Sequence, residues 1–291
     1  MRALLDPIFR RFTALGRLDV EWPDGRVTTY AGTPGPEASI RIRDARTIRR
    51  LVSNPGLAVG EAYMDGTLEP VEGTIYDLLA VAAVNTAGPF TRHPMLELRA
   101  ALARLTRRLA QFNPAGRARR NVAHHYDLNG RTYSLFLDRD RQYSCAYFRR
   151  GDETLEQAQL AKKRHIAAKL LLNRPDLRVL DIGSGWGGMA LTLARDYGAR
   201  VTGITLSTEQ LAESRARAES EGLAERVQFE LLDYRSVDRT FDRIVSVGMF
   251  EHVGVSHYRA FFEVVKRCLA PDGVALIHAI GRSDGPGTTN S

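Results

Sequence analysis

Residues 131–148 gather side chains that could do chemistry. The stretch reads RTYSLFLDRDRQYSCAYF, and it contains five aromatic residues together with Cys145, one of only two cysteines in the chain. An ordinary hydrophobic core uses fewer tyrosines, because each buried phenol needs a hydrogen-bond partner. Taken alone, Cys145 is more typical of a small buried apolar residue than of a reactive thiol. The combination makes this stretch a candidate functional segment.

A glycine-rich stretch, VLDIGSGWGG, is a second candidate. Gly183, Gly185 and Gly188 satisfy the G-x-G-x-x-G pattern, which on its own would indicate a dinucleotide site. However, the next expected strand ends in GITLS, without the acidic residue that holds an NAD ribose. The spacing Asp181-x-Gly183-x-Gly185-x-Gly187 resembles the first motif of class I S-adenosylmethionine-dependent methyltransferases. The alternative is a turn that only packs a helix against a strand.

The elements that must hold these residues alternate along the chain from about residue 153. The expected strands are 178–183, 200–205, 226–233, 242–250 and 273–281, and the expected helices are 153–172, 188–198, 208–222 and 256–269. Five strands separated mostly by helices predict an α/β fold with a parallel sheet wrapped by helices on both faces. Ligands bind such a sheet at the carboxyl ends of its strands.

Two further polar residues fall at these strand ends. Glu251 follows the fourth expected strand, and His278 lies near the end of the fifth. Each has an ordinary interpretation by itself, Glu251 as the start of a helix and His278 as a hydrogen-bonded core histidine. Their joint position at neighbouring strand ends favours a shared site near the glycine turn.

Length and composition predict two domains. The 291 residues exceed the usual size of one hydrophobic core, and 44% hydrophobic with 26% charged residues is typical of a globular protein. Residues 1–115 contain strand-like stretches at 18–30 and 38–43, with a loop rich in Gly and Pro at 31–37 between them. We therefore expect a smaller α+β N-terminal domain, followed by the catalytic domain at 116–291.

The formal net charge of +7 is concentrated in residues 1–123, which hold 18 Lys+Arg against 12 Asp+Glu. Within them, residues 95–112 predict a helix with a leucine stripe and four arginines elsewhere around it. Such a helix could lie on an anionic membrane surface or on nucleic acid. The ordinary alternative is a surface helix that packs its leucines on the protein's own core.

Other features narrow the class of protein. Two cysteines suit a reducing cytosol, and the apolar run at 78–84 is too short to cross a bilayer. The N-terminus lacks the uninterrupted apolar stretch of a secretory signal, so we expect a cytoplasmic protein. His124 and His125 lack metal-site spacing, which predicts no metal, and Cys268 fits a buried helix face.

Several motifs together resemble one family. HHYDLNGRTYSLFLDRDRQYSCAYF (124–148), GITLSTEQ (203–210), GMFEHVG (248–254) and IHAIG (277–281) resemble the cyclopropane-fatty-acyl-phospholipid synthase and mycolic acid cyclopropane synthase family. GEAYMDGTLE (60–69) resembles the N-terminal domain of the branch that acts on phospholipids. The resemblance implies S-adenosyl-L-methionine as methyl donor, a bound bicarbonate ion, and phospholipid acyl chains as substrate.

The resemblance also implies a role for individual residues. The residues expected at the methionine end of the cofactor are Tyr143, Ser144 and the motif of Asp181, Gly183, Gly185 and Gly187. Those expected at its ribose and adenine are Thr205, Gln210, Asp233 and Tyr234. Those expected to bind bicarbonate are Cys145, Glu251, His278 and the backbone of Ile280.

The implied reaction accounts for these residue types. A cis double bond attacks the sulfonium methyl, a carbocation forms on the acyl chain, and loss of a proton closes a three-membered ring. Such a site must exclude water and place a base beside the new methyl. Aromatic rings stabilise the cation by about 0.5–2 kcal/mol each, and bicarbonate oriented by Glu251 and His278 accepts the proton. We expect the rings of Tyr133, Phe136, Tyr143, Tyr147 and Phe148 to line this site.

Alternatives stay open at this point. A related enzyme could resolve the cation as a methyl branch or act on mycolic acids, and a catalytically inactive lipid- or nucleotide-binding protein is a third reading. Nucleic-acid methylation is disfavoured, because no Asn/Asp-Pro-Pro-Tyr motif for a flipped base is present.

The sequence ends directly after the fifth expected strand, whereas the sheet of this class continues to a sixth and a seventh. We therefore expect a fold that is truncated there, with an unpaired edge that favours association of two copies into a homodimer. Because the substrate lies in a bilayer, we also expect peripheral binding of the basic N-terminal part to the anionic inner face of the membrane.

Overall fold

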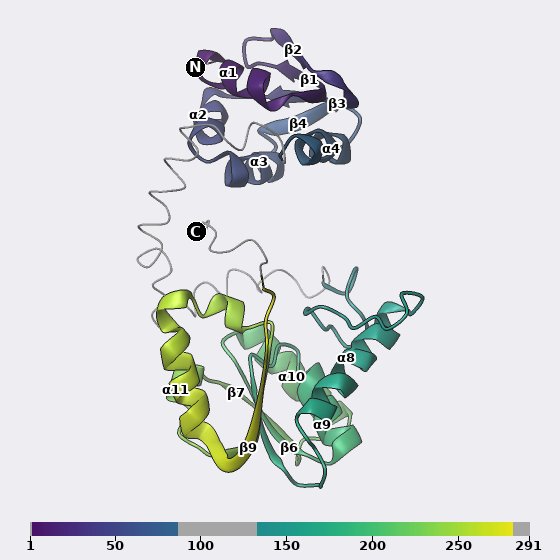
Figure 1. Cartoon of the computed structure of the whole chain (residues 1–291), viewed down its shortest axis with the longest axis vertical. Helices are drawn as coiled ribbons and strands as arrows, with labels where there is room; N and C mark the ends of the chain where they lie inside the picture. Colours follow the sequence, from purple (N-terminus) through teal and green to yellow (C-terminus); the bar gives the residue numbers. More distant parts are fainter. Residues whose placement is uncertain (1, 87–132, 282–291) are drawn as a thin grey trace. The chain divides into compact units, whose positions relative to one another are not determined.

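The structure is a computed structural model, and it describes residues 2–86 and 133–281 (Figure 1). The chain divides into two compact units, one containing the first described range and the other containing the second. The expected domain boundary between residues 115 and 116 and the expected basic helix at 95–112 lie outside the described residues.

The N-terminal unit is an α+β domain. Its strands are β1 (Leu15–Glu21), β2 (Val27–Ala31), β3 (Thr33–Ile42) and β4 (Leu68–Glu72), and its helices are α1 (Arg2–Phe12), α2 (Ala45–Ser53), α3 (Pro55–Met64) and α4 (Ile75–Thr86). The sheet order is β2-β1-β3-β4. β1 pairs with β2 antiparallel and with β3 parallel, and β3 pairs with β4 antiparallel.

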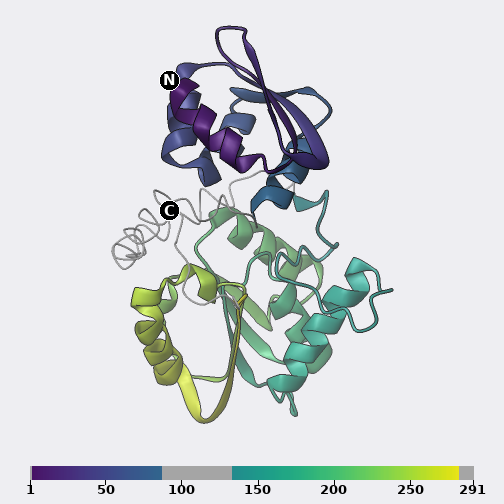
Figure 2. The ribbon, with the colours of Figure 1, turned by 45° about the horizontal axis from the view of Figure 1, so that its top comes forward.

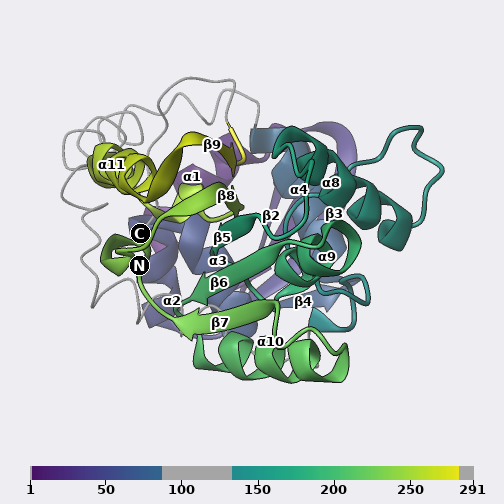
Figure 3. The ribbon, with the colours of Figure 1, turned by 90° about the horizontal axis from the view of Figure 1, so that it is seen from below.

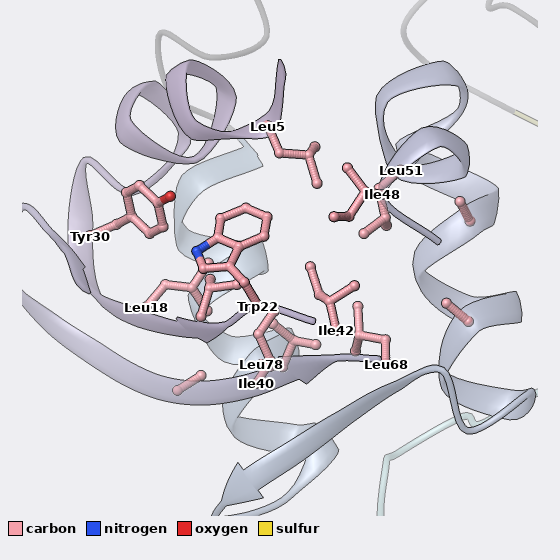
Figure 4. Packing of buried hydrophobic residues seen from close by; sticks show 14 of the residues in the cluster. Leu5, Leu18, Trp22, Tyr30, Ile40, Ile42, Ile48, Leu51, Leu68 and Leu78 are labelled. Carbon is pink, nitrogen blue, oxygen red and sulfur yellow. The ribbon is translucent and has the colours of Figure 1, made fainter. Parts of the chain in front are cut away.

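Alternation along the strands builds the core of this unit. Leu18, Val20 and Trp22 are buried and pack with side chains from α1, α2 and α4 (Figure 4). Polar atoms at the core margin are paired, since Trp22 Nε1 donates to Thr28 Oγ1 at 2.9 Å and the Tyr30 hydroxyl donates to Asp6 Oδ1 at 2.9 Å. The polar atoms at the margin of this core are therefore hydrogen-bonded to groups of the same domain.

The expected loop at 31–37 is wrong, because strand β3 already begins at Thr33. Glycines there serve close backbone approach rather than a turn. A Cβ on Gly16 would lie 2.0 Å from Pro36 O, and a Cβ on Gly35 would lie 2.9 Å from Gly16 N. The β1–β3 register also shifts between Leu15 and Arg17. Gly and Pro in this stretch thus mark an irregular strand, which local sequence does not distinguish from a loop.

Charges in the folded N-terminal unit nearly balance. Residues 1–86 hold ten Arg and no Lys against eleven Asp or Glu, whereas residues 87–123 hold eight Arg against one Glu. Arginines of the sheet are paired across strands: Arg41 contacts Glu21 at 2.9 Å and Glu69 at 3.1 Å, and Arg43 contacts Glu69 at 2.7 Å. The positive surplus of the first 123 residues therefore lies entirely in 87–123.

The second unit contains the predicted parallel sheet. Its strands are β5 (Arg178–Ile182), β6 (Arg200–Thr205), β7 (Val227–Leu231), β8 (Phe241–Val247) and β9 (Leu269–His278), in the order β7-β6-β5-β8-β9. All four pairings are parallel. All five strands are therefore confirmed, although β9 begins four residues before the expected position, and its register with β8 shifts between Phe241 and Arg243.

Helices cover both faces of this sheet (Figure 3). They are α8 (Leu155–Lys169), α9 (Gly188–Tyr197), α10 (Thr208–Ser220) and α11 (Tyr258–Cys268), with short 3₁₀ turns η2 (Tyr234–Ser236), η3 (Phe250–His252) and η4 (Val255–His257). Side chains of α8, α9 and α10 share one core cluster, and those of α11 belong to another. Figure 2 shows α11 beside β9. Cys268 is buried in the α11 cluster, as expected.

Local signals fix the helix ends that matter for the site. Thr154 and Gln157 form a reciprocal capping box at the start of α8, and the Ser207 side chain caps α10. Arg243, buried on β8, donates to the carbonyls of Leu170 and Leu171 just after α8. The chain leaves β5 toward β6 on one side and returns to β8 on the other, so the carboxyl ends of β5 and β8 form the topological switch point at which sheets of this kind bind ligands.

Candidate active site

Three glycines of the turn after β5 have left-handed backbones, with φ of 81° at Gly183, 55° at Gly185 and 84° at Gly187. Their surroundings differ. A Cβ on Gly183 would lie 2.9 Å from Met249, and one on Gly187 would lie 2.7 Å from Phe229, whereas nothing lies within 4 Å of the position on Gly185. Packing therefore explains two of these glycines, and Gly185 is the one that faces open space where a ligand could approach the backbone.

Asp181 lies on β5 directly before this turn and is only 2% exposed. Burial raises the pKa of its carboxyl group to about 7. Its Oδ2 atom is buried and has no hydrogen-bond partner among the described residues. An unpartnered buried carboxyl group is costly, so its position below a glycine turn indicates a group that a ligand completes.

The ends of β6 and β7 place the other residues expected to bind the cofactor. Thr205 Oγ1 donates to Gln210 Oε1 at 2.8 Å, so this expected pair is brought together in a buried position. At the end of β7, Arg235 Nη2 contacts Asp233 Oδ2 at 2.7 Å, and the Tyr234 ring packs edge-on against Phe261. Asp233 and Tyr234 thus lie at the expected strand end, but their side chains already have protein partners.

Glu251 and Ile280 meet directly. The backbone N–H of Ile280 donates to Glu251 Oε1 at 2.6 Å, which ties the turn after β8 to the segment after β9. Gly248 N donates to His278 O at 3.1 Å at the same edge. Two buried atoms here, Glu251 Oε2 and His278 Nδ1, have no hydrogen-bond partner in the described part of the chain. A carboxylate oxygen just after β8 and an imidazole nitrogen at the end of β9 are therefore available to a ligand.

A strip of backbone at residues 142–145 crosses this edge. Ser144 Cβ lies 3.5 Å from the position of a Cβ on Gly248, at the tip of β8. Gln159 Nε2, on α8, donates to the carbonyls of Gln142 at 3.1 Å and Ser144 at 3.0 Å, which fixes the strip. Cys145 follows Ser144 but is exposed, and its thiol is free. Of the four residues expected to bind bicarbonate, a hydrogen bond in the described part of the chain joins only Glu251 and Ile280, and neither His278 nor Cys145 has a side-chain contact with them.

The five aromatic rings of 131–148 do not form one lining. Tyr133 is buried and contacts Phe136, Tyr143 and Trp186, with ring centroids 5.9, 5.5 and 4.8 Å away. Tyr147 instead stacks on His165 of α8 at 4.7 Å. Phe136, Tyr143, Tyr147 and Phe148 are all exposed. The expectation of a single aromatic wall is wrong for Tyr147, because α8 offers its ring a separate stacking partner.

Sequence reasoning missed an ionic cluster beside the glycine turn. Asp140 forms ion pairs with Lys163 and Arg217, and Arg217 Nη1 also donates to Trp186 O at 2.7 Å within the turn. Although burial opposes ionisation, these two cations lower the pKa of Asp140. The cluster therefore ties the 131–148 segment to the glycine turn.

Three polar residues of α8, one of them in this cluster, are of types that usually face solvent. Gln159, Lys162 and Lys163 are buried on α8, on the face that also buries Ile166. Their spacing was the one sequence signal of this burial, because Lys163 and Lys162 lie three and four residues before Ile166 and therefore share its helix face. Lysine is rarely buried, so composition alone argues against this placement.

Comparison with known proteins decides the family. The sequence profile of the family described as mycolic acid cyclopropane synthetase matches residues 114–290. The chain belongs to this family. A second profile, for a domain of unknown function, matches residues 5–94 of the N-terminal unit.

Curated relatives extend the similarity. The chain is 42% identical to the cyclopropane-fatty-acyl-phospholipid synthase of Escherichia coli K12 over 84% of its length and 61% of the relative. It is 38% identical to a probable fatty acid methyltransferase of Pseudomonas putida, over 85% of the chain and 60% of that protein. A probable fatty acid methyltransferase of Mycobacterium tuberculosis is 33% identical over 99% of the chain and 72% of its own length. The chain thus spans about three fifths of the first two relatives.

Solved structures agree with the fold. A mycolic acid cyclopropane synthase complexed with SAH and CTAB aligns with a TM-score of 0.54 and 38% identity, covering 57% of each chain. The cyclopropane synthase MmaA2 from Mycobacterium tuberculosis has the same TM-score and identity and covers 58% of this chain and 57% of its own. These similarities and the sheet order confirm the predicted class I methyltransferase fold of the second unit.

Two kinds of feature are absent from the residues that the structure describes. None of the helices in 2–86 and 133–281 is long and apolar enough to span a membrane. The same ranges hold no group of three or more His, Cys, Asp and Glu side chains with the arrangement of a metal site. His124 and His125 lie outside these ranges.

Proposed function

We propose that this protein transfers the methyl group of S-adenosylmethionine to a cis double bond in a phospholipid acyl chain and closes a cyclopropane ring. The observation that carries the proposal is the Glu251–Ile280 link, with the unpartnered Glu251 Oε2 and His278 Nδ1 atoms beside it. These groups lie at the carboxyl end of the sheet, where this fold binds ligands. Membership of the cyclopropane synthetase family supports the same reaction.

The residues present fit S-adenosylmethionine. Gly185 leaves open space over the turn, and the unpartnered Asp181 Oδ2 suits a positively charged amino group. In the buried Thr205–Gln210 pair the amide oxygen of Gln210 accepts from Thr205, so its NH₂ group is the one that would donate to a ribose hydroxyl. When bound, the cofactor supplies an electrophilic methyl group. Tyr143 and Ser144 would hold its methionine end, and Asp233 and Tyr234 would border its adenine.

The residues at the β8 and β9 tips also fit bicarbonate. Glu251 Oε2 can accept the hydrogen of that ion, and a protonated His278 Nδ1 can donate to one of its oxygens. When bound, the ion supplies a proton acceptor. The N–H of Ile280 is already bonded to Glu251, so Ile280 acts mainly by fixing that carboxylate. Cys145, which is exposed and free, is the least supported of the four expected ligands.

Aromatic residues of this unit would stabilise the cation formed on the acyl chain. The exposed Phe136 and Tyr143 both contact the buried Tyr133, which itself packs against the buried Trp186. Each correctly oriented ring contributes roughly 0.5–2 kcal/mol. Tyr147, stacked on His165, is left out of this role.

We further propose that the protein binds the cytoplasmic face of the membrane peripherally. The N-terminal unit exposes apolar side chains on its third and fourth helices, among them Met64 at 81%, Tyr76 at 75% and Leu79 at 54% exposed. Residues 87–123 add eight Arg against one Glu. Each basic residue near an anionic surface contributes about 1 kcal/mol, so two different forces support docking.

The reaction is tested with S-adenosylmethionine that carries a trideuterated methyl group. Incubation with vesicles of an unsaturated phospholipid, followed by mass spectrometry of the acyl chains, should find two of the three deuterium atoms retained, because ring closure removes one. Retention of all three would identify a methyl branch instead. Binding of S-adenosylhomocysteine without any change in the acyl chains, on phospholipid or on mycolic acid, would refute the enzymatic proposal.

Membrane docking is tested by flotation with anionic and neutral vesicles at low salt. Replacing Arg99, Arg104, Arg107 and Arg108 by Gln should abolish the preference for anionic vesicles. Equal flotation of the wild type with both kinds of vesicle would contradict the electrostatic part of the proposal.

A further inference from the structure

Lys162 is a buried cation that neither the motifs nor the family comparison assigns. It lies in the middle of α8 and is only 4% exposed. Its Nζ donates to Ser144 Oγ at 2.8 Å. No carboxylate of the described residues forms an ion pair with it, and burial lowers its pKa to about 8. A buried ammonium group held only by a hydroxyl is costly, so its retention calls for a negatively charged partner.

The acidic groups near Lys162 each have another partner, and neither forms an ion pair with it. Charged and titratable groups facing it are Asp138, Asp140, Lys163 and Cys145. Asp140 is shared by Lys163 and Arg217, and Asp138 accepts a hydrogen bond from Gln142 N at 2.7 Å. Burial also raises the pKa of Asp138. Lys163 pairs with Asp140, and Arg217 pairs with Asp140 and Glu221, whereas Lys162 has no ion-pair partner among the described residues and lies beside Ser144.

The chemistry of the ammonium group fixes which atom donates in the Lys162–Ser144 hydrogen bond. An ammonium group has donors only, so Ser144 Oγ must accept from Lys162, and the hydroxyl hydrogen of Ser144 is left to donate elsewhere. That hydrogen has no acceptor among the residues that the structure describes. Ser144 itself lies against Gly248 at the tip of β8. A polarised hydroxyl donor, hydrogen-bonded to a cation, thus lies beside the carboxyl end of β8.

Helix α8 holds this arrangement rigidly. Gln159 lies three residues before Lys162 on the same face, and its amide fixes the carbonyls of Ser144 and Gln142. The capping box at Thr154 and Gln157 anchors the start of the helix, and Arg243 binds the carbonyls just beyond its end. The Lys162–Ser144 bond is therefore set by the protein before a ligand arrives.

We propose that Lys162 is a positioning residue for the carboxylate of the cofactor's methionine moiety, and that it acts through the Ser144 hydroxyl. The inference rests on the proposed function, because it assumes that S-adenosylmethionine binds at the carboxyl ends of β5 and β8. The ammonium group orients Ser144 as a donor and supplies the positive charge that a carboxylate requires.

Two ligands that differ only at the methionine end test this. S-Adenosylhomocysteine carries the carboxylate, whereas 5′-deoxy-5′-methylthioadenosine lacks it, and calorimetry measures both without turnover. Lys162→Met should weaken S-adenosylhomocysteine by about tenfold or more and methylthioadenosine by less than about twofold. Lys169→Met, a change of an exposed lysine on the same helix, is the control and should alter neither affinity. Equal weakening of both ligands, or of neither, would overturn the inference.

The pH dependence adds a readout that a purely structural lysine would not move. Because the pKa of Lys162 is about 8, the affinity of the wild type for S-adenosylhomocysteine should fall above pH 8 as the ammonium group loses its proton. Lys162→Arg should bind well and lose this decline, since arginine stays charged. The same decline in Lys162→Arg would contradict the inference.

A double-mutant cycle identifies the route. If Lys162 acts through Ser144, then Ser144→Ala and Lys162→Met should together cost about as much affinity as the larger single change, whereas additive losses would refute the route. A Lys162→Met effect confined to the bicarbonate dependence of turnover, with S-adenosylhomocysteine binding unchanged, would assign the cation to the other anion and overturn the proposal. Failure of the wild type to bind either nucleoside would refute the proposed function itself.

Discussion

The two units of this protein treat buried polar groups in opposite ways. In the N-terminal unit, Asn85 is buried but makes four hydrogen bonds, to Ala14 N, Leu15 N, Leu15 O and Val81 O. In the methyltransferase unit, buried atoms of Gln159, Asp181, Glu251 and His278 lack partners among the described residues, whereas the N-terminal unit has one such atom, on Thr13. Buried polar atoms without hydrogen-bond partners thus lie mainly in the unit where a ligand is expected. The N-terminal unit, whose buried polar atoms are mostly paired, instead exposes apolar side chains on its helices.

The largest effect should come from Glu251. Glu251→Gln keeps an oxygen to accept the Ile280 N–H but removes the carboxylate charge, so we expect ring formation to fall by roughly 10²–10⁴-fold while S-adenosylhomocysteine still binds. Glu263→Gln, on the exposed face of α11, is the matched control and should leave turnover unchanged. Loss of nucleoside binding in Glu251→Gln would show that this residue belongs to the cofactor site instead.

Asp181→Asn should separate stability from binding. The pKa of Asp181 is raised to about 7 by burial, so the folded state binds this proton more tightly than the unfolded state does. The resulting stability is present below pH 4 and is lost as pH rises to 7, by up to about 4 kcal/mol. At pH 8 the variant should therefore be more stable to urea than the wild type, and equal to it near pH 4.

The same variant should bind S-adenosylhomocysteine about tenfold more weakly, because its amide cannot pair with the ligand's ammonium group. Unchanged affinity together with unchanged stability would mean that the unpartnered carboxyl group has no bearing on the site, and the contrast between the two units would weaken.

Asn85→Ala tests the satisfied unit. The change leaves the backbone groups at Ala14, Leu15 and Val81 without their partner, so we expect the free energy of unfolding of the N-terminal unit to fall by about 2–4 kcal/mol. Urea unfolding followed by Trp22 fluorescence reports on this unit, together with the signal of Trp186 from the other. Affinity for S-adenosylhomocysteine should stay within twofold of the wild type, roughly the limit set by independent sites.

The smallest effect concerns the exposed apolar faces. Met64→Ser combined with Leu79→Ser should weaken vesicle flotation by about fivefold, since each side chain buries only part of its area in a membrane. Val27→Ser removes an equally exposed apolar group from β2 and serves as the control. Identical losses from Val27→Ser would show that the helix faces have no special role in docking.

Local sequence determined the helices and strands of the second unit and the residue types of its motifs. The periodicity from residue 153 onward predicts all five strands, because parallel strands flanked by helices are buried on both faces and read as apolar runs. The order of Asp181, Gly183, Gly185, Glu251 and His278 along those strands places the site at one edge of the sheet. These inferences need only the rule that parallel strands end together.

The tertiary structure decided which groups are buried and with whom they pair. Lys162 on α8 and the strand that begins at Thr33 were unpredictable, because burial and close backbone approach sum contacts from residues far away in the chain. The same holds for Gly185, which alone of the three positive-φ glycines faces open space, and for Tyr147, which leaves the aromatic group for His165. A residue's type and spacing state what it can do, whereas its long-range neighbours decide whether it is left free to do so.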